Sequence, residues 1–288
     1  MMRKFLSVLL CAALAATLAM GCSSGDQENK EAETGASTAE NTEENKEEKG
    51  TIKIGCGAMT EYGATLIAEQ MESLGYETEL VMFDGNDLPA KALAAGDIDA
   101  LLANHLPWIE TFNANSGTDL RMIKPYFYYS PYSLYSTKYD SVEDIPDGAK
   151  ISIPNDPTNM ERSLVMLQDL GMITLGDKSG EFYTVADIED NKKNIEFFEV
   201  EMTATVANIK DVDAGFSAAV AIEQSGVMEG KDWLYMDASS VNYPVSLVVN
   251  AEDEDAEWAV EAMKLMKQED VMQTFDEKVN GVFVQYEE

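Results

Sequence analysis

The sequence predicts an α/β protein with two lobes, and three observations lead to that fold class. Short apolar runs alternate with amphipathic stretches along residues 51–288, a second set of such runs begins near residue 150, and segments rich in Tyr, Ser and Pro near residues 130–140 and 238–246 separate the sets. Strands that alternate with helices are typical of α/β domains with covered sheets. Two such sets predict two lobes, with a ligand in a cleft outside the carboxyl ends of the strands.

The first set opens with a strand at residues 51–57, TIKIGCG. Thr60 then caps a helix at 61–75, which has a regular apolar face and ends at Gly75. The remaining elements of this set follow in order: a strand at 77–83, a helix at 87–99, a strand at 100–104, a helix at 107–117, extended segments at 122–130 and 133–138, and a turn-rich connection at 140–148.

The second set opens with a strand at 150–156 and a helix at 158–171. Thr158 and Glu161 match the T-x-x-E capping box, which places the start of this helix. The later elements are an extended segment at 182–189, strands at 195–200, 214–220, 233–237 and 243–250, and helices at 204–211 and 252–269. The final strand and helix are expected to return to the first lobe, so that lobe 1 comprises 51–137 plus 247–288 and lobe 2 comprises 138–246.

The N-terminal residues predict export and a lipid anchor. Arg3 and Lys4 precede the apolar run 5–20, which is short for a membrane span and is typical of a signal peptide at 1–21. The sequence AMGC resembles a bacterial lipobox, so Cys22 is expected to be acylated, for example with palmitate; a plain signal peptide with an incidental Cys is the alternative. Residues 22–50 are acidic and without apolar periodicity, as in a disordered tether. We expect a soluble domain held on the extracytoplasmic face of the cell membrane.

Charge and cysteine content exclude several classes of function. The formal net charge is −33, which repels nucleic acid and argues against nucleic-acid binding. After loss of Cys11 and acylation of Cys22, Cys56 is alone, so a disulfide framework is not expected. Cys56 lies in a strand pattern and is interpreted as a small buried hydrophobic residue.

Arg162 is the residue that most strongly suggests a binding site. It follows the loop PNDPTN and lies near the start of the helix at 158–171, where the backbone dipole disfavours a cation. Free backbone N–H groups and a guanidinium together form an anion site, so a ligand carboxylate would explain this placement. The alternative is that Arg162 pairs with Asp156 or Glu161, and the residues alone leave both interpretations open.

The other motifs argue against catalysis, metals and cofactors. His105 is the single histidine, and no spacing resembles a metal cluster. Trp108 is either an apolar wall for a ligand or a packing residue of lobe 1. GCGAMTEYG matches neither a P-loop nor G-x-G-x-x-G, and no G-x-S-x-G elbow is present. We therefore expect no enzyme activity and no cofactor.

The segment 144–175, DIPDGAKISIPNDPTNMERSLVMLQDLGMITL, closely resembles the signature of NlpA-type lipoproteins, a family that includes the methionine-binding proteins of ABC importers. TIKIG, LAAGDIDA, NHLPWIETFN and NGVFVQ also have counterparts in that family. The resemblance implies a two-lobed periplasmic-binding-protein fold, type 2-like, with two chain crossings at the hinge. It also implies a monomer that captures an amino acid or small peptide and delivers it to an ABC permease.

The resemblance assigns roles to residues by position. Arg162 matches the family arginine that holds the ligand carboxylate, and Asn155 and Asn159 match the loop asparagines. The remaining candidates are Asn104 and His105, which stand where the family usually has a Gln-His pair, and Trp108, which stands where the family has a Tyr. Asn86 lies near the position of another family Tyr, and Ser246 stands where the family has an Asn.

The family motif A-V-I-N-x-N-Y-A reads AGFSAAVA here, so Ala218 and Val220 replace two asparagines that would bind the ligand's amino and carboxylate groups. The expected function is an extracytoplasmic substrate-binding lipoprotein of an ABC importer, with a methionine-like amino acid, small peptide or carboxylate held through Arg162. The alternative is a ligand-binding or adhesion surface lipoprotein that kept the fold but not amino-acid transport.

Overall fold

The computed structural model describes residues 49–287, which belong to one compact unit of residues 46–288. The predicted signal peptide, the acylation site Cys22 and the tether up to residue 48 lie outside the described residues. Within the described part of the chain, no helix is both long and apolar enough to cross a membrane.

The first sheet has the strand order β2-β1-β3-β13-β4. Its strands are β1 Thr51–Cys56, β2 Glu77–Met82, β3 Ala100–Leu102, β4 Leu120–Met122 and β13 Val248–Asn250. β1 runs parallel to β2 and β3, whereas β13 runs antiparallel to β3 and β4. Because β13 follows the second sheet in the chain, a late segment completes the first sheet.

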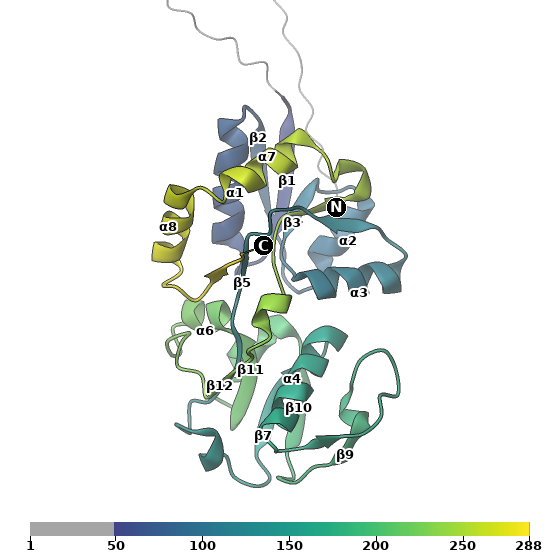
Figure 1. The fold of residues 1–288 in the computed structure, drawn as a ribbon, viewed down its shortest axis with the longest axis vertical. Coiled ribbons are helices and arrows are strands. Elements are labelled where there is room, and N and C mark those ends of the chain that lie inside the picture. Colours follow the sequence, from purple (N-terminus) through teal and green to yellow (C-terminus); the bar gives the residue numbers. More distant parts are fainter. Residues whose placement is uncertain (1–48, 288) are drawn as a thin grey trace, which may run out of the picture. The chain divides into compact units, whose positions relative to one another are not determined.

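The helices of this half are α1 Glu61–Ser73, α2 Leu88–Ala95, α3 Leu106–Ser116, α7 Glu257–Leu265 and α8 Glu269–Lys278, which surround β1–β3 in Figure 1. The helix expected at 252–269 is shorter: a 3-10 turn, η5 Ala251–Asp253, precedes α7. α8 was missing from the sequence prediction, because this charged segment buries only Met272 and Phe275.

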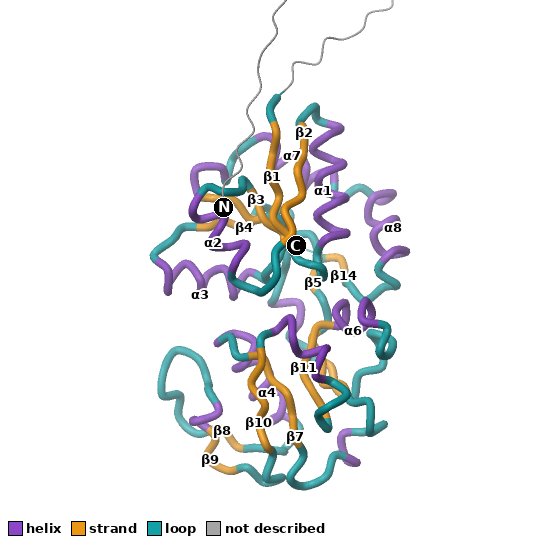
Figure 2. Tube along the Cα trace, turned by 180° about the vertical axis from the view of Figure 1, so that it is seen from behind, coloured by secondary structure: helices purple, strands orange, loops and turns teal. Residues whose placement is uncertain are grey.

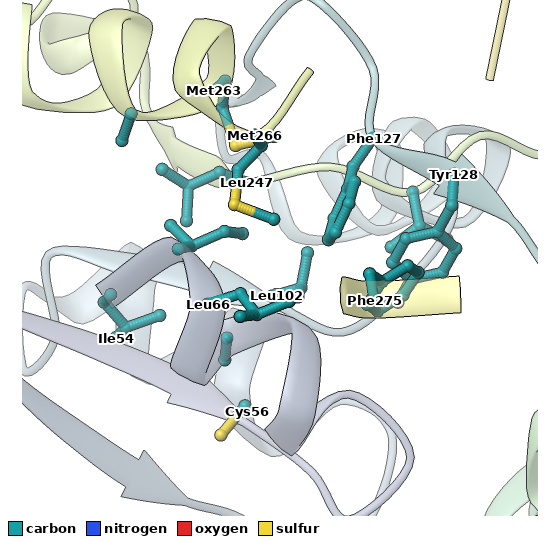
Figure 3. Packing of buried hydrophobic residues seen from close by; sticks show 14 of the residues in the cluster. Ile54, Cys56, Leu66, Leu102, Phe127, Tyr128, Leu247, Met263, Met266 and Phe275 are labelled. Atoms are coloured by element: carbon teal, nitrogen blue, oxygen red, sulfur yellow. The ribbon is translucent and has the colours of Figure 1, made fainter. Parts of the chain in front are cut away.

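The core of this half lies between α1 and the C-terminal helices. Figure 3 shows Leu66 and Leu102 near Met263 and Met266, with Phe127, Tyr128 and Phe275 at one end of the cluster. Cys56 belongs to the same core and is a free, fully buried cysteine, as the sequence predicted. Burial raises the pKa of its thiol to about 11, so the thiol stays protonated and behaves as an apolar group.

The second sheet has the order β10-β7-β11-β6-β12. Its strands are β6 Tyr132–Tyr135, β7 Lys150–Pro154, β10 Glu196–Val200, β11 Ala214–Ala218 and β12 Tyr235–Met236. β7 runs parallel to β10 and β11, and β6 runs antiparallel to β11 and β12. The helices are α4 Pro157–Asp169, α5 Thr205–Asn208 and α6 Ala219–Ser225, and the 3-10 turns are η1 Val142–Asp144, η2 Val185–Asp187, η3 Met202–Ala204 and η4 Ser240–Asn242. The pair β8 Thr174–Leu175 and β9 Ile188–Asp190 extends beside it (Figure 2).

The two sheets confirm the predicted α/β class and its division into two sets of elements. Two segments connect the sheets: the stretch between β5 Tyr128–Tyr129 and β6, and the stretch between η4 and β13 (Figure 1). β14 Val284–Gln285 pairs with β5 beside the first connection. β6 falls within the segment 51–137 that was assigned to lobe 1, yet it pairs in the second sheet. We therefore propose lobe limits that follow the sheets, with the first crossing between β5 and β6.

Candidate functional site

α4 begins one residue earlier than the sequence predicted, with Asp156 as its N-cap and Pro157 as its first residue. The Asp156 carboxylate accepts hydrogen bonds from the backbone N–H of Asn159 at 3.0 Å, from the Thr158 hydroxyl at 2.9 Å and from the Asn159 side-chain amide at 3.1 Å. The predicted capping box of Thr158 and Glu161 is therefore wrong. Asp156 is favoured over Thr158 at the N-cap position because its carboxylate also places an anion at the positive end of the helix.

Glu161 has a different role from the one expected. Its carboxylate accepts the backbone N–H of Tyr183 at 2.7 Å and lies 2.8 Å from the ammonium of Lys178. It therefore holds the loop that follows β8. With the helix start at Pro157, Arg162 is in the second turn of α4, where the unfavourable effect of the dipole on a cation has largely faded.

Arg162 is buried and held by a segment far away in the sequence. Its Nε donates to the carboxylate of Asp237, and its Nη2 donates to the hydroxyl of Ser240 at 2.7 Å. The guanidinium also lies over the rings of Tyr243 and Tyr132, at 3.9 and 4.4 Å from their centroids. Two aromatic faces and a carboxylate stabilise the cation away from water, and the partners considered from sequence, Asp156 and Glu161, are not used.

The guanidinium nevertheless lines a cavity. This cavity encloses about 90 Å³ and lies where strands of both sheets end. Its walls come from the loops after β1, β2 and β3, the two crossing segments, the first two turns of α4, η3, the start of α6 and the residue before β14. The lining residues are Met59, Thr60, Asn86, Ala103, Asn104, His105, Tyr128, Ser130, Tyr132, Asn159, Arg162, Met202, Ala218, Val220, Tyr243, Val245 and Phe283. The position at the strand ends is the one that the α/β pattern predicted.

The surface of this cavity is largely apolar, and its polar groups come from elements of both halves. Arg162 is the one lining residue with an ionised side chain among those described, because burial, reinforced by the charge of Arg162, lowers the pKa of His105 to about 4. Burial also lowers the pKa of Arg162, against the opposing effect of Asp237, but a guanidinium remains charged at neutral pH. The site thus offers one cation, several amide and hydroxyl groups, and an apolar wall.

His105 connects the two halves of the protein. Its Nδ1 accepts the backbone N–H of Trp108 at 3.2 Å, which caps α3 and leaves the proton on Nε2. Nε2 then donates to the Asn159 side-chain oxygen at 3.1 Å, and Asn159 in turn donates to Asp156. This chain of hydrogen bonds links the start of α3 in the first half to the start of α4 in the second.

The other predicted site residues divide into two groups. Asn86 and Asn104 line the cavity, and the Asn104 amide donates to the Asn86 backbone oxygen at 2.8 Å. Asn155 is exposed and lies outside the cavity, with its backbone N–H on the oxygen of Val200. Whether the lining residues bind a ligand stays a prediction.

Two further candidates are packing residues in this structure. Trp108 stacks on Phe112 within the core of the first half, at 5.4 Å between ring centroids, as the packing interpretation expected. Ser246 is fully buried and contacts the backbone oxygen of Pro125 at 3.5 Å, away from the cavity.

Sequence reasoning missed Asp237, Ser240 and the two tyrosines around the guanidinium. Asp237 is 75 residues from Arg162, and the predicted strand at 233–237 gave its side chain no role. One local signal existed: Asp237, Ser239 and Ser240 form a turn in which the Asp237 carboxylate accepts the backbone N–H of Ser239 at 2.7 Å. A buried arginine also requires an acidic partner, which restricts the search.

Within residues 49–287, no group of three or more His, Cys, Asp or Glu side chains is arranged to hold a metal ion. The residues that line the cavity instead combine a guanidinium, amide and hydroxyl groups and apolar side chains, a composition typical of small-molecule pockets. A carboxylate would take the guanidinium, and an apolar body would contact Met59, Met202 and Phe283.

Comparisons with known proteins agree with this geometry. The model of the NlpA lipoprotein family matches residues 52–286. The D-methionine-binding lipoprotein MetQ of Escherichia coli (strain K12) is 31% identical over 235 residues, covering 80% of this chain and 86% of that protein.

Solved structures show the same two-lobed fold. A nutrient-binding protein of Burkholderia cenocepacia bound to methionine aligns with a TM-score of 0.75 and 27% identity, over 81% of this chain and 99% of that one. A lipoprotein of Ruminococcus gnavus aligns with a TM-score of 0.74 and 29% identity, over 82% and 99%. The family model covers nearly all of the described residues, and the chain belongs to the NlpA lipoprotein family.

Proposed function

We propose that this protein is the extracytoplasmic substrate-binding component of an ABC importer. Its cavity would capture a methionine-like amino acid, a small peptide or a small carboxylate. The observation that carries the proposal is the buried guanidinium of Arg162 at an apolar cavity lined by residues of both halves. Relatives named as methionine-binding, and one solved in complex with methionine, support the ligand class. Closure of the two halves around the ligand would create the surface that a permease recognises.

The free edge of Arg162 is its Nη1 group. Nε and Nη2 are engaged by Asp237 and Ser240, while Nη1 donates no hydrogen bond within the described residues. A ligand carboxylate would accept from this edge, with a charge-assisted bond stronger than one between neutral groups. The thioether and aromatic side chains among the lining residues would suit an unbranched apolar side chain.

The cellular setting follows from the N-terminus and the family. We propose that Cys22 carries the lipid and that residues 22–50 tether the domain to the outer face of the cell membrane, where a permease lies within reach. The protein would act there as a monomer without a cofactor and without catalysis. Metabolic labelling with a palmitate analogue should label the wild type and leave a Cys22→Ser variant unlabelled.

Isothermal titration calorimetry of the purified protein against the twenty amino acids and methionine-containing dipeptides tests the proposal. We expect at least one of them to bind. Arg162→Lys should weaken that ligand more than about tenfold, because an ammonium cannot serve Asp237, Ser240 and a ligand together. Arg121→Lys is the matched control, since Arg121 is exposed on β4 and pairs with Asp119. Binding by none of these ligands would overturn the proposal.

A second candidate function is favoured by Ala218 and Val220. Both line the cavity at the start of α6 and contribute no side-chain hydrogen bond there. A protein that had lost amino-acid transport but kept the fold as a surface-binding or adhesion lipoprotein would show such a wall. Uptake of labelled methionine by cells that lack the gene, compared with complemented cells, separates the two: equal uptake favours the second candidate.

A further inference from the structure

Asp237 lies behind Arg162 as seen from the cavity and is not itself a lining residue. One carboxylate oxygen, Oδ2, accepts from Arg162 Nε, and the other, Oδ1, accepts the backbone N–H and the hydroxyl of Ser239, each at 2.7 Å. Ser240 completes the arrangement: its hydroxyl donates to the Asp237 backbone oxygen at 2.7 Å and accepts from Arg162 Nη2. Asp237 is only 8% exposed, so it is held against the guanidinium.

The segment that carries Asp237 is itself fixed to the second sheet. The backbone N–H of Asp237 donates to the oxygen of Tyr132 at 2.9 Å, and the Tyr132 N–H donates to the Ser240 hydroxyl at 3.2 Å. Tyr132 is also one of the two rings beneath the guanidinium. The carboxylate, the guanidinium and the aromatic ring are therefore joined in one network of contacts.

The positive charge of Arg162 is already offset by carboxylates of the protein itself. Arg162 supplies one positive charge and Asp237 one negative charge in direct contact with it. The imidazole of His105 is neutral, and Asp156, the N-cap of α4, adds a second negative charge on the Asn159 side. A ligand that carries a net negative charge would therefore bring uncompensated charge into a buried site, which is costly. A zwitterion would bring none.

We propose that Asp237 is a specificity-determining residue, which positions Arg162 and offsets its charge so that the cavity selects ligands of zero net charge over anions. This inference rests on the proposed function. A residue with only a structural role would change the affinity for every ligand alike. A residue that sets the charge of the site would instead change the ratio of affinities between ligands of different charge.

Three probes of nearly equal size measure the ratio of affinities between ligands of different charge. 4-(Methylthio)butanoate is an anion, L-methionine is a zwitterion and L-methioninamide is a cation, and all three share one side chain. Calorimetry at neutral pH should show that the wild type binds L-methionine at least about tenfold more tightly than the anion, given the interaction of one buried charge with another a few ångströms away. Equal or tighter binding of the anion would overturn the inference without any variant.

Asp237→Asn keeps the shape of the side chain and removes its charge. We expect the preference for L-methionine over 4-(methylthio)butanoate to fall by at least about tenfold in this variant, and the conservative variant Asp237→Glu to restore it. Asp232→Asn is the matched control, since Asp232 is exposed on the same segment and does not line the cavity. A uniform loss of affinity for all three probes would return Asp237 to a structural role.

Failure of the inference and failure of the proposed function give different results. If no probe binds the wild type, the methionine-like ligand class is wrong and this inference is overturned as well. If L-methionine binds but the ratio is unchanged in Asp237→Asn, the proposed function stands and the inference is overturned. If Asp237→Asn does not fold, as judged by circular dichroism, the wild-type ratio alone decides.

Discussion

At the residue scale, the position of Arg162 depends on an ion pair that is largely shielded from water. Only about 4% of the Arg162 side chain and 9% of the Asp237 side chain are exposed. Removing one partner of such a pair leaves a buried charge without compensation and typically costs about 3–5 kcal/mol, whereas replacing both with apolar residues costs far less. The pair is therefore a poor source of stability and is better understood as a device that places the guanidinium at the cavity.

A double-mutant cycle measures the coupling between Arg162 and Asp237. Arg162→Met alone should lower the free energy of unfolding by about 3–5 kcal/mol, and Arg162→Met combined with Asp237→Leu should recover much of that loss, because no charge is left buried. Urea denaturation followed by tryptophan fluorescence gives each value. Additive losses in the double variant would show that the two residues do not act as a pair.

The pKa of His105 makes a second prediction at this scale. Burial lowers it from 6.5 to about 4 in the folded protein, so the unfolded chain binds the proton more readily between these values. The contribution of His105 to the free energy of unfolding is fully present above pH 6.5. It is lost as the pH falls toward 4, by about 3 kcal/mol in total.

A His105→Gln variant keeps a hydrogen-bonding side chain but does not titrate. The difference in unfolding free energy between wild type and variant should therefore shrink or reverse in favour of the variant between pH 7 and 4. Parallel urea titrations at several pH values measure it, and the carboxylates common to both proteins cancel in the difference. A constant difference over this range would contradict the assigned pKa.

At the element scale, the start of α4 places both Arg162 and Asn159. Asp156 accepts from the backbone and side chain of Asn159, and Asn159 carries the contact to His105. Asp156→Ala should lower the free energy of unfolding by about 1–2 kcal/mol through loss of the cap. It should also weaken ligand binding, since Asn159 loses its support.

Asp169→Ala is the matched control for this prediction. Asp169 is exposed at the last residue of α4, where an anion is unfavourable, so its removal should leave stability unchanged or slightly improved. Thermal and urea unfolding of both variants give the comparison. Equal losses in the two would mean that α4 does not depend on its N-cap.

The elements also show what sequence patterns can and cannot predict. The strand and helix at 150–171 were found, and Arg162 was singled out, because local hydrophobic periodicity and a long motif both mark this region. The cap of α4 was misassigned because Asp156 and Thr158 are both good capping residues two positions apart. The strand predicted at 214–220 includes the start of α6, since AGFSAAV is apolar apart from Ser217 and a short apolar run has no distinctive period.

The partners of Arg162 could not be predicted from the sequence for a different reason. The ion pair and the aromatic rings join residues that are 75 or more positions apart or that lie on another strand, and only the sheet order brings them together. The same holds for Phe283, which reaches the cavity wall from the far end of the chain. Periodicity describes each element alone, so contacts set by topology remain invisible to it.

At the scale of the whole molecule, one apolar cluster joins the first sheet, the hinge and the C-terminal segment. The rings of Tyr128 at the first crossing, Phe275 in α8 and Phe283 before β14 pack together, with 4.1 Å between the Tyr128 and Phe283 ring centroids and 5.0 Å between those of Phe275 and Phe283. Val220, from the start of α6 in the second half, belongs to the same cluster. Stability and cavity shape are therefore coupled through this cluster.

Phe283→Ala tests that coupling. Phe283 is 6% exposed and lines the cavity, so its truncation should lower the free energy of unfolding by about 3–5 kcal/mol. Binding of an apolar ligand should weaken in the same variant, because one wall of the cavity is removed. The neighbouring Val284→Ala is the control: Val284 is 38% exposed, and its truncation should change stability by less than about 0.5 kcal/mol. Urea denaturation and calorimetry on the two variants give both quantities. A loss of stability without a loss of affinity would show that the C-terminal segment supports the core but takes no part in shaping the site.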